Sequence, residues 1–467
     1  MMAPEPAALP DDVLAEVLRR LTPLALAASR RVCRAWRGAV DTRLRGHLLS
    51  RSVRGIFINF TAYRNHFSEF FYRPSTGPPI CGGLGFLPCK GIKVADHCNG
   101  LLLCADQERR EYVVNPATRR WARLPRRPPP HMPGLILSSY LAFEPAVSPH
   151  YEVFVVARLP AAGQSDGDGE SYKDDSWLLE SEWPPTSYVL HVFSSKADWW
   201  EEKTFLREGE ARGTVADMDS DPPYDRYRYH AVYWRGALYI HCQHCFLTRM
   251  SLSNHMYRAI GLPGAHELGG YPSYYLGRSL RGVYCAKDIY DHRLQLWHLD
   301  ESRIQTEWVL KHDINLEAFS RKFYELNDML FEKFEEDPAQ QVGGPWIIED
   351  VNYQKDFEYY GNIEYNAPVE QKYDWNSDED DILDIEDVVE GNYSGNYHFL
   401  GFHPYKEIVY LDFSVDRGVA YDWNNSKFQD LGNLQPEDYH YGVPGTDSSF
   451  VYTPCWMGEF PGNELET

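Results

Sequence analysis

The chain has 467 residues, of which 43% are hydrophobic and 24% are charged, as in an ordinary globular protein. At roughly 150 residues per domain, this length predicts two or three domains, or one large repeat domain with a small companion. The net charge of −22 argues against nucleic acids and anionic membranes as partners, so we expect neither.

The cysteines and the N-terminal residues indicate a reducing compartment. Nine cysteines are an odd number, spread thinly along the chain, which does not suit a disulfide framework. The N-terminus lacks the basic and apolar regions of a secretion signal, and no run of about 18 uncharged apolar residues follows it. We therefore expect a soluble protein of the cytoplasm or the nucleus.

Charge is distributed unevenly along the chain. Residues 1–54 hold ten arginines and five acidic residues, a net charge of +5. Residues 313–390 hold 23 acidic and five basic residues, a net charge of −18. Most of the excess negative charge therefore belongs to one segment.

The first fifty residues predict three short helices. Pro10 suits the first turn of a helix over residues 10–21, and Thr22-Pro23 begins a second helix. A third is predicted over residues 33–49. One helical face of the first helix carries Val13, Leu14, Val17, Leu18 and Leu21. Such a small bundle has little core of its own, so its apolar surface either packs on the next domain or covers a partner.

This segment resembles the F-box over about residues 8–50. The residues in register are Leu9, Pro10, Leu14, Val17, Leu18, Leu21, Pro23, Arg31, Val32, Cys33, Trp36 and Arg37. In that family the Leu-Pro pair and the apolar residues after it dock on the Skp-type adaptor of an SCF ubiquitin ligase. The resemblance implies these adaptor contacts: Leu9, Pro10, Leu14, Leu18, Leu21 and Leu24.

From about residue 53 the sequence reads as β repeats. Short runs rich in Val, Ile, Tyr, Phe and Trp are bounded by Gly, Pro, Asn and Asp. The aromatic residues Trp200, Tyr257 and Trp308 are 57 and 51 residues apart, which fits one four-stranded propeller blade per repeat. Similar units are found at residues 99–125, 140–206, 233–263, 282–310 and 402–431.

We therefore predict an α+β multidomain protein. A small three-helix domain at 8–50 follows a disordered N-terminus at 1–7, and an all-β propeller-like repeat domain fills 51–467. The first estimate is six blades, and the spacing allows five to eight. The alternative is an irregular sandwich of stacked sheets. Closure of a ring predicts that a strand near 55–60 pairs with one near 449–453.

The repeats resemble the kelch-like F-box-associated domain of plant F-box proteins. The motifs N-P-A-T-R-R-W-A-R-L-P and F-E-P-A-V-S-P-H-Y-E-V-F-V-V carry this resemblance. The Gly-Gly pairs do not recur in every unit, as they do in true kelch repeats. Two insertions interrupt the units: a polar loop at 161–185 and the acidic segment at 313–390. Within the acidic insertion we predict an amphipathic helix over 316–336 and a poorly ordered tail over 376–390.

The sequence holds no nucleophile elbow, no phosphate-binding loop and no zinc-protease motif, so we expect no catalytic residue and no cofactor. The segment 241–245, H-C-Q-H-C, has metal-like spacing, but no second cysteine pair follows it, so we expect no metal site. Tyr224, Tyr227 and Tyr229 lie between repeats and are the predicted substrate contacts, because binding residues concentrate on loops.

Together these features imply a substrate-recognition adaptor of an SCF-type E3 ubiquitin ligase. The helices would bind a Skp-type adaptor and, through it, a cullin. The propeller would hold a protein substrate while ubiquitin transfer is catalysed elsewhere, so we expect no enzyme activity. The acidic insertion favours a basic substrate. Two alternatives stay open: a non-ligase interaction scaffold, and an enzyme with its site in the propeller channel.

Overall fold

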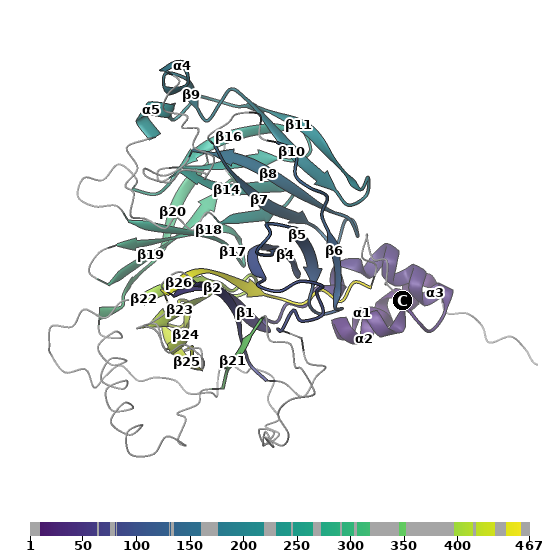
Figure 1. Cartoon of the computed structure of the whole chain (residues 1–467). Coiled ribbons are helices and arrows are strands. Elements are labelled where there is room, and N and C mark those ends of the chain that lie inside the picture. Colours follow the sequence, from purple (N-terminus) through teal and green to yellow (C-terminus); the bar gives the residue numbers. More distant parts are fainter. Residues whose placement is uncertain are drawn as a thin grey trace, which may run out of the picture.

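The computed structural model shows a helical unit beside a ring of β-sheets (Figure 1). The residues described are 10–62, 65–74, 80, 82–129, 131, 135–159, 176–218, 230–243, 246–264, 272–289, 292–302, 306–317, 345–351, 397–413, 417–434 and 445–458.

The helices begin where the sequence predicts. The helical unit consists of α1 (Asp11–Arg19), α2 (Pro23–Ser29), α3 (Arg34–Ala39), the π-helical turn η1 (Val40–Leu44) and the 3₁₀ turn η2 (Arg45–Leu48). Acidic side chains occupy the first turn of α1 and Arg19 its last turn, so both ends suit the helix dipole. At the start of α2 the Thr22 hydroxyl accepts a hydrogen bond from the Ala25 N–H at 3.3 Å.

The described strands form six four-stranded antiparallel blades, which confirms the predicted number. Given from the inner to the outer strand, blades 1 to 3 are β3 (Lys93–Cys98), β4 (Leu101–Ala105), β5 (Glu111–Asn115), β6 (Arg120–Arg123); β7 (Ile136–Phe143), β8 (Tyr151–Arg158), β10 (Ser187–Ser194), β11 (Trp199–Arg207); and β13 (Ala231–Trp234), β14 (Ala237–Gln243), β15 (Phe246–Ser251), β16 (Met256–Gly261). Blades 4 to 6 are β17 (Ser273–Ser279), β18 (Gly282–Ile289), β19 (Arg293–Asp300), β20 (Glu307–Asn315); β22 (Tyr397–Phe402), β23 (Ile408–Phe413), β24 (Arg417–Asp422), β25 (Lys427–Asn433); and β26 (Gly445–Tyr452), β1 (Gly55–Ala62), β2 (Asn65–Tyr72), β21 (Ile347–Asp350).

The inner strands contact one another in the cyclic order β3, β7, β13, β17, β22 and β26. This closed ring identifies a β-propeller, and the alternative of an irregular sandwich is wrong. The outer strands of blades 2 and 3 also pair, in parallel, where Leu206 and Arg207 meet Met256 and Tyr257. That short pairing joins these two blades into one eight-stranded sheet.

The ring closes by pairing the two ends of the β-domain. Strand β26 runs antiparallel to β1, with Gly55 opposite Tyr452 and Phe57 opposite Phe450, so the predicted pairing is confirmed. The side-chain amide of Asn59 is buried here and donates to the Val94 carbonyl and to the Ser448 hydroxyl, both at 2.7 Å. Asn59 thereby ties blade 6 to blade 1.

The two predicted insertions contain regular structure. The end of the polar loop, from residue 176, forms the short helix α4 (Ser176–Leu179) and the strand β9 (Glu182–Trp183), which pairs with β12 (Gly213–Thr214) beside the short helix α5 (Val215–Met218). Within the acidic insertion, β21 is the outer strand of blade 6. Its tail at 376–390, the predicted helix beyond residue 317 and residues 1–7 lie outside the described residues.

Candidate functional site

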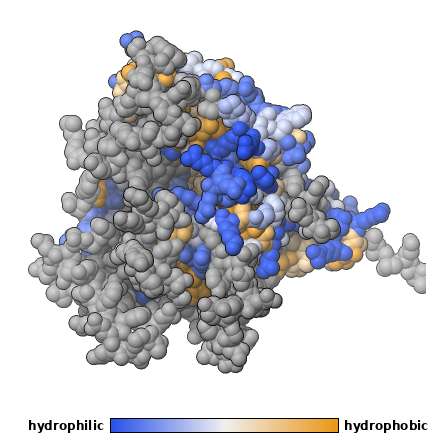
Figure 2. Space-filling view, viewed as in Figure 1, coloured by the Kyte–Doolittle hydropathy of each residue, from blue (hydrophilic) through white to orange (hydrophobic). Residues whose placement is uncertain are grey.

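Helix α1 has a buried apolar side and an exposed apolar side. Leu14 and Leu18 are only 3% and 0% exposed, and they pack in one cluster with other buried residues of the helical unit. Val13, Val17 and Leu21 are 46%, 51% and 38% exposed. Figure 2 shows hydrophobic residues at the surface of the helical unit. Val13 and Val17 are four residues apart on one side of α1, and Leu21 follows just after the helix ends; we call these three exposed side chains the α1 stripe.

The structure divides the six predicted adaptor contacts. Pro10 and Leu21 are exposed and Leu24 is half-buried, so these three are accessible. Leu14 and Leu18 are inside the chain's own core, and an adaptor cannot reach them without rearrangement of the helical unit. Leu9 lies outside the described residues. Val13 and Val17 are exposed as well but are not among the six, although the period of the helix already marked both as apolar.

The helical unit is held on the propeller through the buried side of α1. The cluster around Leu14 and Leu18 continues into buried side chains of blades 1 and 2. The Trp456 N–H donates to the Leu48 carbonyl at 2.8 Å, and the Ser50 N–H donates to the Pro454 carbonyl at 2.8 Å. These backbone bonds fix the helical unit on the segment that follows β26.

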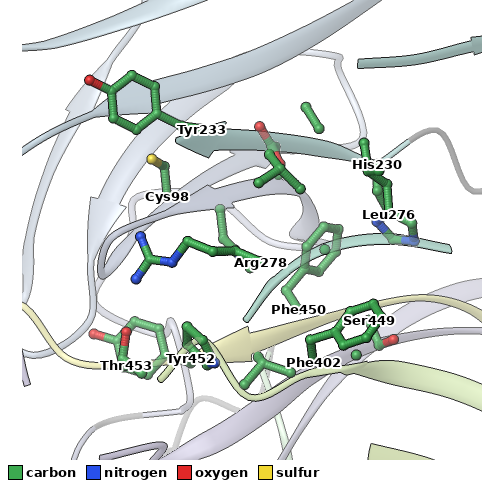
Figure 3. A pocket seen from close by; sticks show the side chains of 18 of the residues that line it. Cys98, His230, Tyr233, Leu276, Arg278, Phe402, Ser449, Phe450, Tyr452 and Thr453 are labelled. Atoms are coloured by element: carbon green, nitrogen blue, oxygen red, sulfur yellow. The ribbon is translucent and has the colours of Figure 1, made fainter. Parts of the chain in front are cut away.

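A second candidate site lies in the propeller channel. A cavity of about 100 Å³ is lined by residues of five of the six inner strands, β3, β13, β17, β22 and β26, and of adjoining turns. Figure 3 shows the Arg278 side chain in this cavity, between Tyr233 and Cys98 on one side and Tyr452 and Thr453 on the other. Arg278 is half-buried near the end of β17, and its Nη1 donates to the Asn99 side-chain oxygen at 2.8 Å.

Two aromatic rings flank the Arg278 guanidinium. The carbon at its centre is 5.0 Å from the centroid of the Tyr405 ring and 5.7 Å from that of Trp234. Both distances are in the range of a cation–π contact. The channel residues Asn99, Trp234, Arg278 and Tyr405 thus come from turns and strands of four different blades. This arrangement can bind a ligand group.

Two titratable residues of the channel have strongly shifted pKa values. Burial raises the pKa of Asp96 to about 7, although its carboxylate accepts the Leu141 N–H at 2.7 Å. Burial, together with the nearby charge of Arg278, lowers the pKa of His97 to about 4. His97 is therefore neutral at neutral pH, and the cation of the channel is Arg278.

The position of Tyr405 depends on a buried histidine that stays neutral. The Nδ1 atom of His403 accepts the Tyr405 N–H at 3.0 Å, and His403 is 1% exposed. Burial lowers the pKa of His403 to about 3, whereas a histidine in the unfolded chain titrates near 6.5. Between these values the unfolded chain binds a proton that the folded chain does not, so stability falls as the pH falls below about 6.5.

We predict that His403→Asn reduces this pH dependence, because an amide oxygen can accept the same N–H and does not titrate. The free energy of unfolding should drop between pH 7 and pH 5 by about 2 kcal/mol less in the variant than in the wild type. Urea unfolding at both pH values measures the difference, with the exposed His255→Asn as control. An unchanged pH dependence in His403→Asn would show that His403 is protonated in the folded chain.

The other predicted site residues are placed as follows. Tyr224, Tyr227 and Tyr229 lie outside the described residues. Of the segment 241–245, His241 and Cys242 are buried, and the Cys242 sulfur is 3.1 Å from the Thr248 hydroxyl oxygen. His244 and Cys245 lie outside the described residues, so the metal-like spacing stays untested.

One group of described residues has the composition of a metal site. His131, His191 and Glu202 place their ligand atoms within 4.8 Å of one another. His191 and Glu202 are opposite each other on β10 and β11, and the rings of His131 and His191 stack with centroids 4.5 Å apart. The His131 Nε2 atom is 3.5 Å from a Glu202 carboxylate oxygen. A ring stack and the contact between His131 and Glu202 hold this group together.

Comparisons with known proteins agree with the N-terminal reading. Residues 6–49 match the F-box-like family. A protein of Arabidopsis thaliana named as an F-box/kelch-repeat protein is 26% identical over 208 residues. The match covers 42% of this chain, and the chain spans 46% of the relative's length.

Solved structures with a similar fold are distant. "YCF48 bound to D1 peptide" is 7% identical, with 82% of each chain covered and a TM-score of 0.29. "Structure of YjhT" is 9% identical, with 49% of this chain and 66% of that chain covered and a TM-score of 0.25. Such scores carry no argument about function. In the described part of the chain no helix is both long and apolar enough to cross a membrane. The chain therefore has an F-box-like segment at its start and six β-propeller blades after it, and it is similar to an F-box/kelch-repeat protein of Arabidopsis thaliana.

Proposed function

We propose that this protein is the substrate-recognition adaptor of an SCF-type ubiquitin ligase. In this role the helical unit binds a Skp-type adaptor and, through it, a cullin, while the propeller holds a protein substrate. The chain itself catalyses nothing. The observation that carries the proposal is the α1 stripe, in which Val13, Val17 and Leu21 are exposed within an F-box-like segment.

The packing of the helical unit supports this role. An amphipathic helix whose buried side already meets its own core leaves a second apolar side for a partner. The hydrogen bonds of Leu48 and Ser50 to the C-terminal segment keep the two domains in a fixed relation. A substrate in the channel would then be held at a fixed distance from the adaptor. Productive ubiquitin transfer requires such positioning.

We also propose that the protein works in a reducing compartment, the cytoplasm or the nucleus. Seven described cysteines are free thiols, and five of them are buried. Burial raises the pKa of buried thiols such as Cys242, to about 11, so they stay protonated and chemically inert.

Affinity purification of the tagged full chain tests the proposal. Extracts with and without a proteasome inhibitor should both yield a Skp-type adaptor and a cullin at comparable amounts. Ubiquitinated proteins should accumulate on the bait only when the proteasome is inhibited. Recovery of a second copy of the chain without adaptor or cullin would favour the scaffold alternative and overturn the ligase role.

A further inference from the structure

We infer that Arg278 binds a carboxylate of a peptide ligand in the propeller channel. The function of that peptide as a ubiquitination substrate rests on the proposed function, whereas the binding site itself does not. The inference starts from the hydrogen bonds that the guanidinium makes and from those that it leaves unmade.

The Arg278 guanidinium has the Tyr405 hydroxyl as one side-chain partner but keeps an N–H without a hydrogen bond. Its Nη1 atom donates to the side-chain oxygen of Asn99, while its Nε atom is buried without a hydrogen-bond partner. No carboxylate of the described residues pairs with Arg278. A buried N–H without a partner is unfavourable, so the channel gains when a ligand supplies an acceptor.

The geometry of the Arg278 guanidinium indicates which kind of acceptor a ligand would supply. The Nε and Nη2 atoms of a guanidinium form a planar fork that matches the two oxygens of one carboxylate. The Tyr405 and Trp234 rings flank the guanidinium, and the Asn99 side chain holds Nη1, so the fork has little freedom to turn away. A fork that is already oriented loses less conformational entropy when a ligand binds.

The titratable residues near the Arg278 guanidinium leave its positive charge available to a ligand. His97 is neutral because burial lowers its pKa to about 4, so no second cation competes for the ligand. Burial raises the pKa of Tyr233 to about 12, so this lining residue is a neutral phenol. The Glu144 carboxylate influences the Tyr233 pKa from nearby, but its Oε1 accepts the Ala146 N–H at 3.4 Å instead of pairing with Arg278.

This site favours a ligand opposite in charge to the basic substrate predicted from the acidic insertion. The prediction of an acidic ligand rests on the described residues of the channel. The prediction of a basic substrate rests on the charge of the acidic insertion, whose tail at 376–390 lies outside the described residues. A substrate that satisfied both would carry an acidic residue for the channel within a basic surface. The channel alone predicts an Asp or Glu side chain.

A peptide-display selection on the purified full chain tests the inference. The probe is a library of random linear peptides, and selected sequences are resynthesised with a fluorophore for affinity measurement. We expect enrichment of Asp or Glu at one position, and about tenfold weaker binding when that residue becomes Gln or Asn. The variants Arg278→Lys, which keeps the charge without the fork, and Arg278→Met should weaken binding by a similar factor. Arg281→Lys is the matched control, because Arg281 is a largely exposed arginine three residues away that pairs with Glu407.

The outcomes separate this inference from the proposed function. Enrichment without acidic residues, or equal affinity for Arg278→Met and wild type, would overturn the carboxylate site. Tighter binding of peptides in which phosphoserine replaces the acidic residue would assign the fork to phosphate and also overturn it. Should both Arg278 variants fail to fold, the Glu→Gln comparison on the wild-type chain still decides. Adaptor binding is measured separately, and the Arg278 variants should bind the adaptor as the wild type does. If the wild-type chain binds no adaptor, that result would count against the ligase role alone.

Discussion

The double substitution Val13→Asp and Val17→Asp is expected to abolish binding of a Skp-type adaptor and to leave the propeller folded. Both valines are about half exposed, so aspartate at these positions stays hydrated in the free protein. In a complex the same carboxylates would be buried against an apolar surface without partners, which costs several kcal/mol. We therefore expect at least a roughly hundredfold loss of affinity. Titration of the purified full chain with the adaptor measures it.

Matched substitutions on the buried side of α1 distinguish docking from folding. Leu14→Ala and Leu18→Ala remove side chains from the cluster that joins the helical unit to the propeller, and each should cost about 2–5 kcal/mol of stability. Their adaptor affinity should fall only as far as the helical unit unfolds, whereas the aspartate variant should lose affinity with an unchanged unfolding midpoint. Wild-type affinity in the aspartate variant would show that the α1 stripe is not the docking surface.

The repeat architecture could be predicted because it follows from local patterns. Short β-rich units bounded by turn residues, with aromatic residues about 50 apart, are enough to predict six blades and the pairing of β1 with β26. The helix boundaries followed in the same way from Pro10, Thr22 and Pro23. The helix boundaries and the β-rich units depend on residues close in sequence, and tertiary packing does not override them. The pairing of β1 with β26 could be predicted because a closed ring requires it.

The functional surfaces could not be predicted in the same way, because they depend on packing between distant parts of the chain. The sequence marks Val13, Leu14, Val17 and Leu18 alike as apolar, and only contact with the propeller decides which of them are buried. Arg278 and Asn99 are 179 residues apart in the chain, yet they share a hydrogen bond across the channel.

The outer strand of blade 6 is another feature that the sequence alone does not predict. Its outer strand, β21, comes from the middle of the acidic insertion, where the charge pattern suggested no strand. The four residues 347–350 are Ile, Ile, Glu and Asp, and a segment of four residues is too short to show the alternation of apolar and polar residues that marks a strand. The strand forms because β2 offers it an unpaired edge, which is information that only the folded blade contains.

Val451→Asp is expected to destabilise the propeller by at least about 4 kcal/mol, because β26 seals the ring on both of its faces. Successive residues of a strand point to opposite faces, and Val451 packs toward blade 5 while Phe450 and Tyr452 pack toward blade 1. A carboxylate at position 451 would be buried among Ile56, Ile408 and other aliphatic side chains without a partner.

The control for this prediction lies on the same strand. Asp447→Asn removes the ion pair with Lys93, whose atoms are 2.7 Å apart but whose side chains are partly exposed, so it should cost less than about 1 kcal/mol. Urea unfolding of the full chain, followed by tryptophan fluorescence and by circular dichroism, measures both variants. A large shift in Val451→Asp with a small one in Asp447→Asn is expected if closure by β26 holds the six blades together. Equal, small shifts would mean that the blades are stable without their closing strand, because a buried charge at position 451 would then cost the propeller nothing.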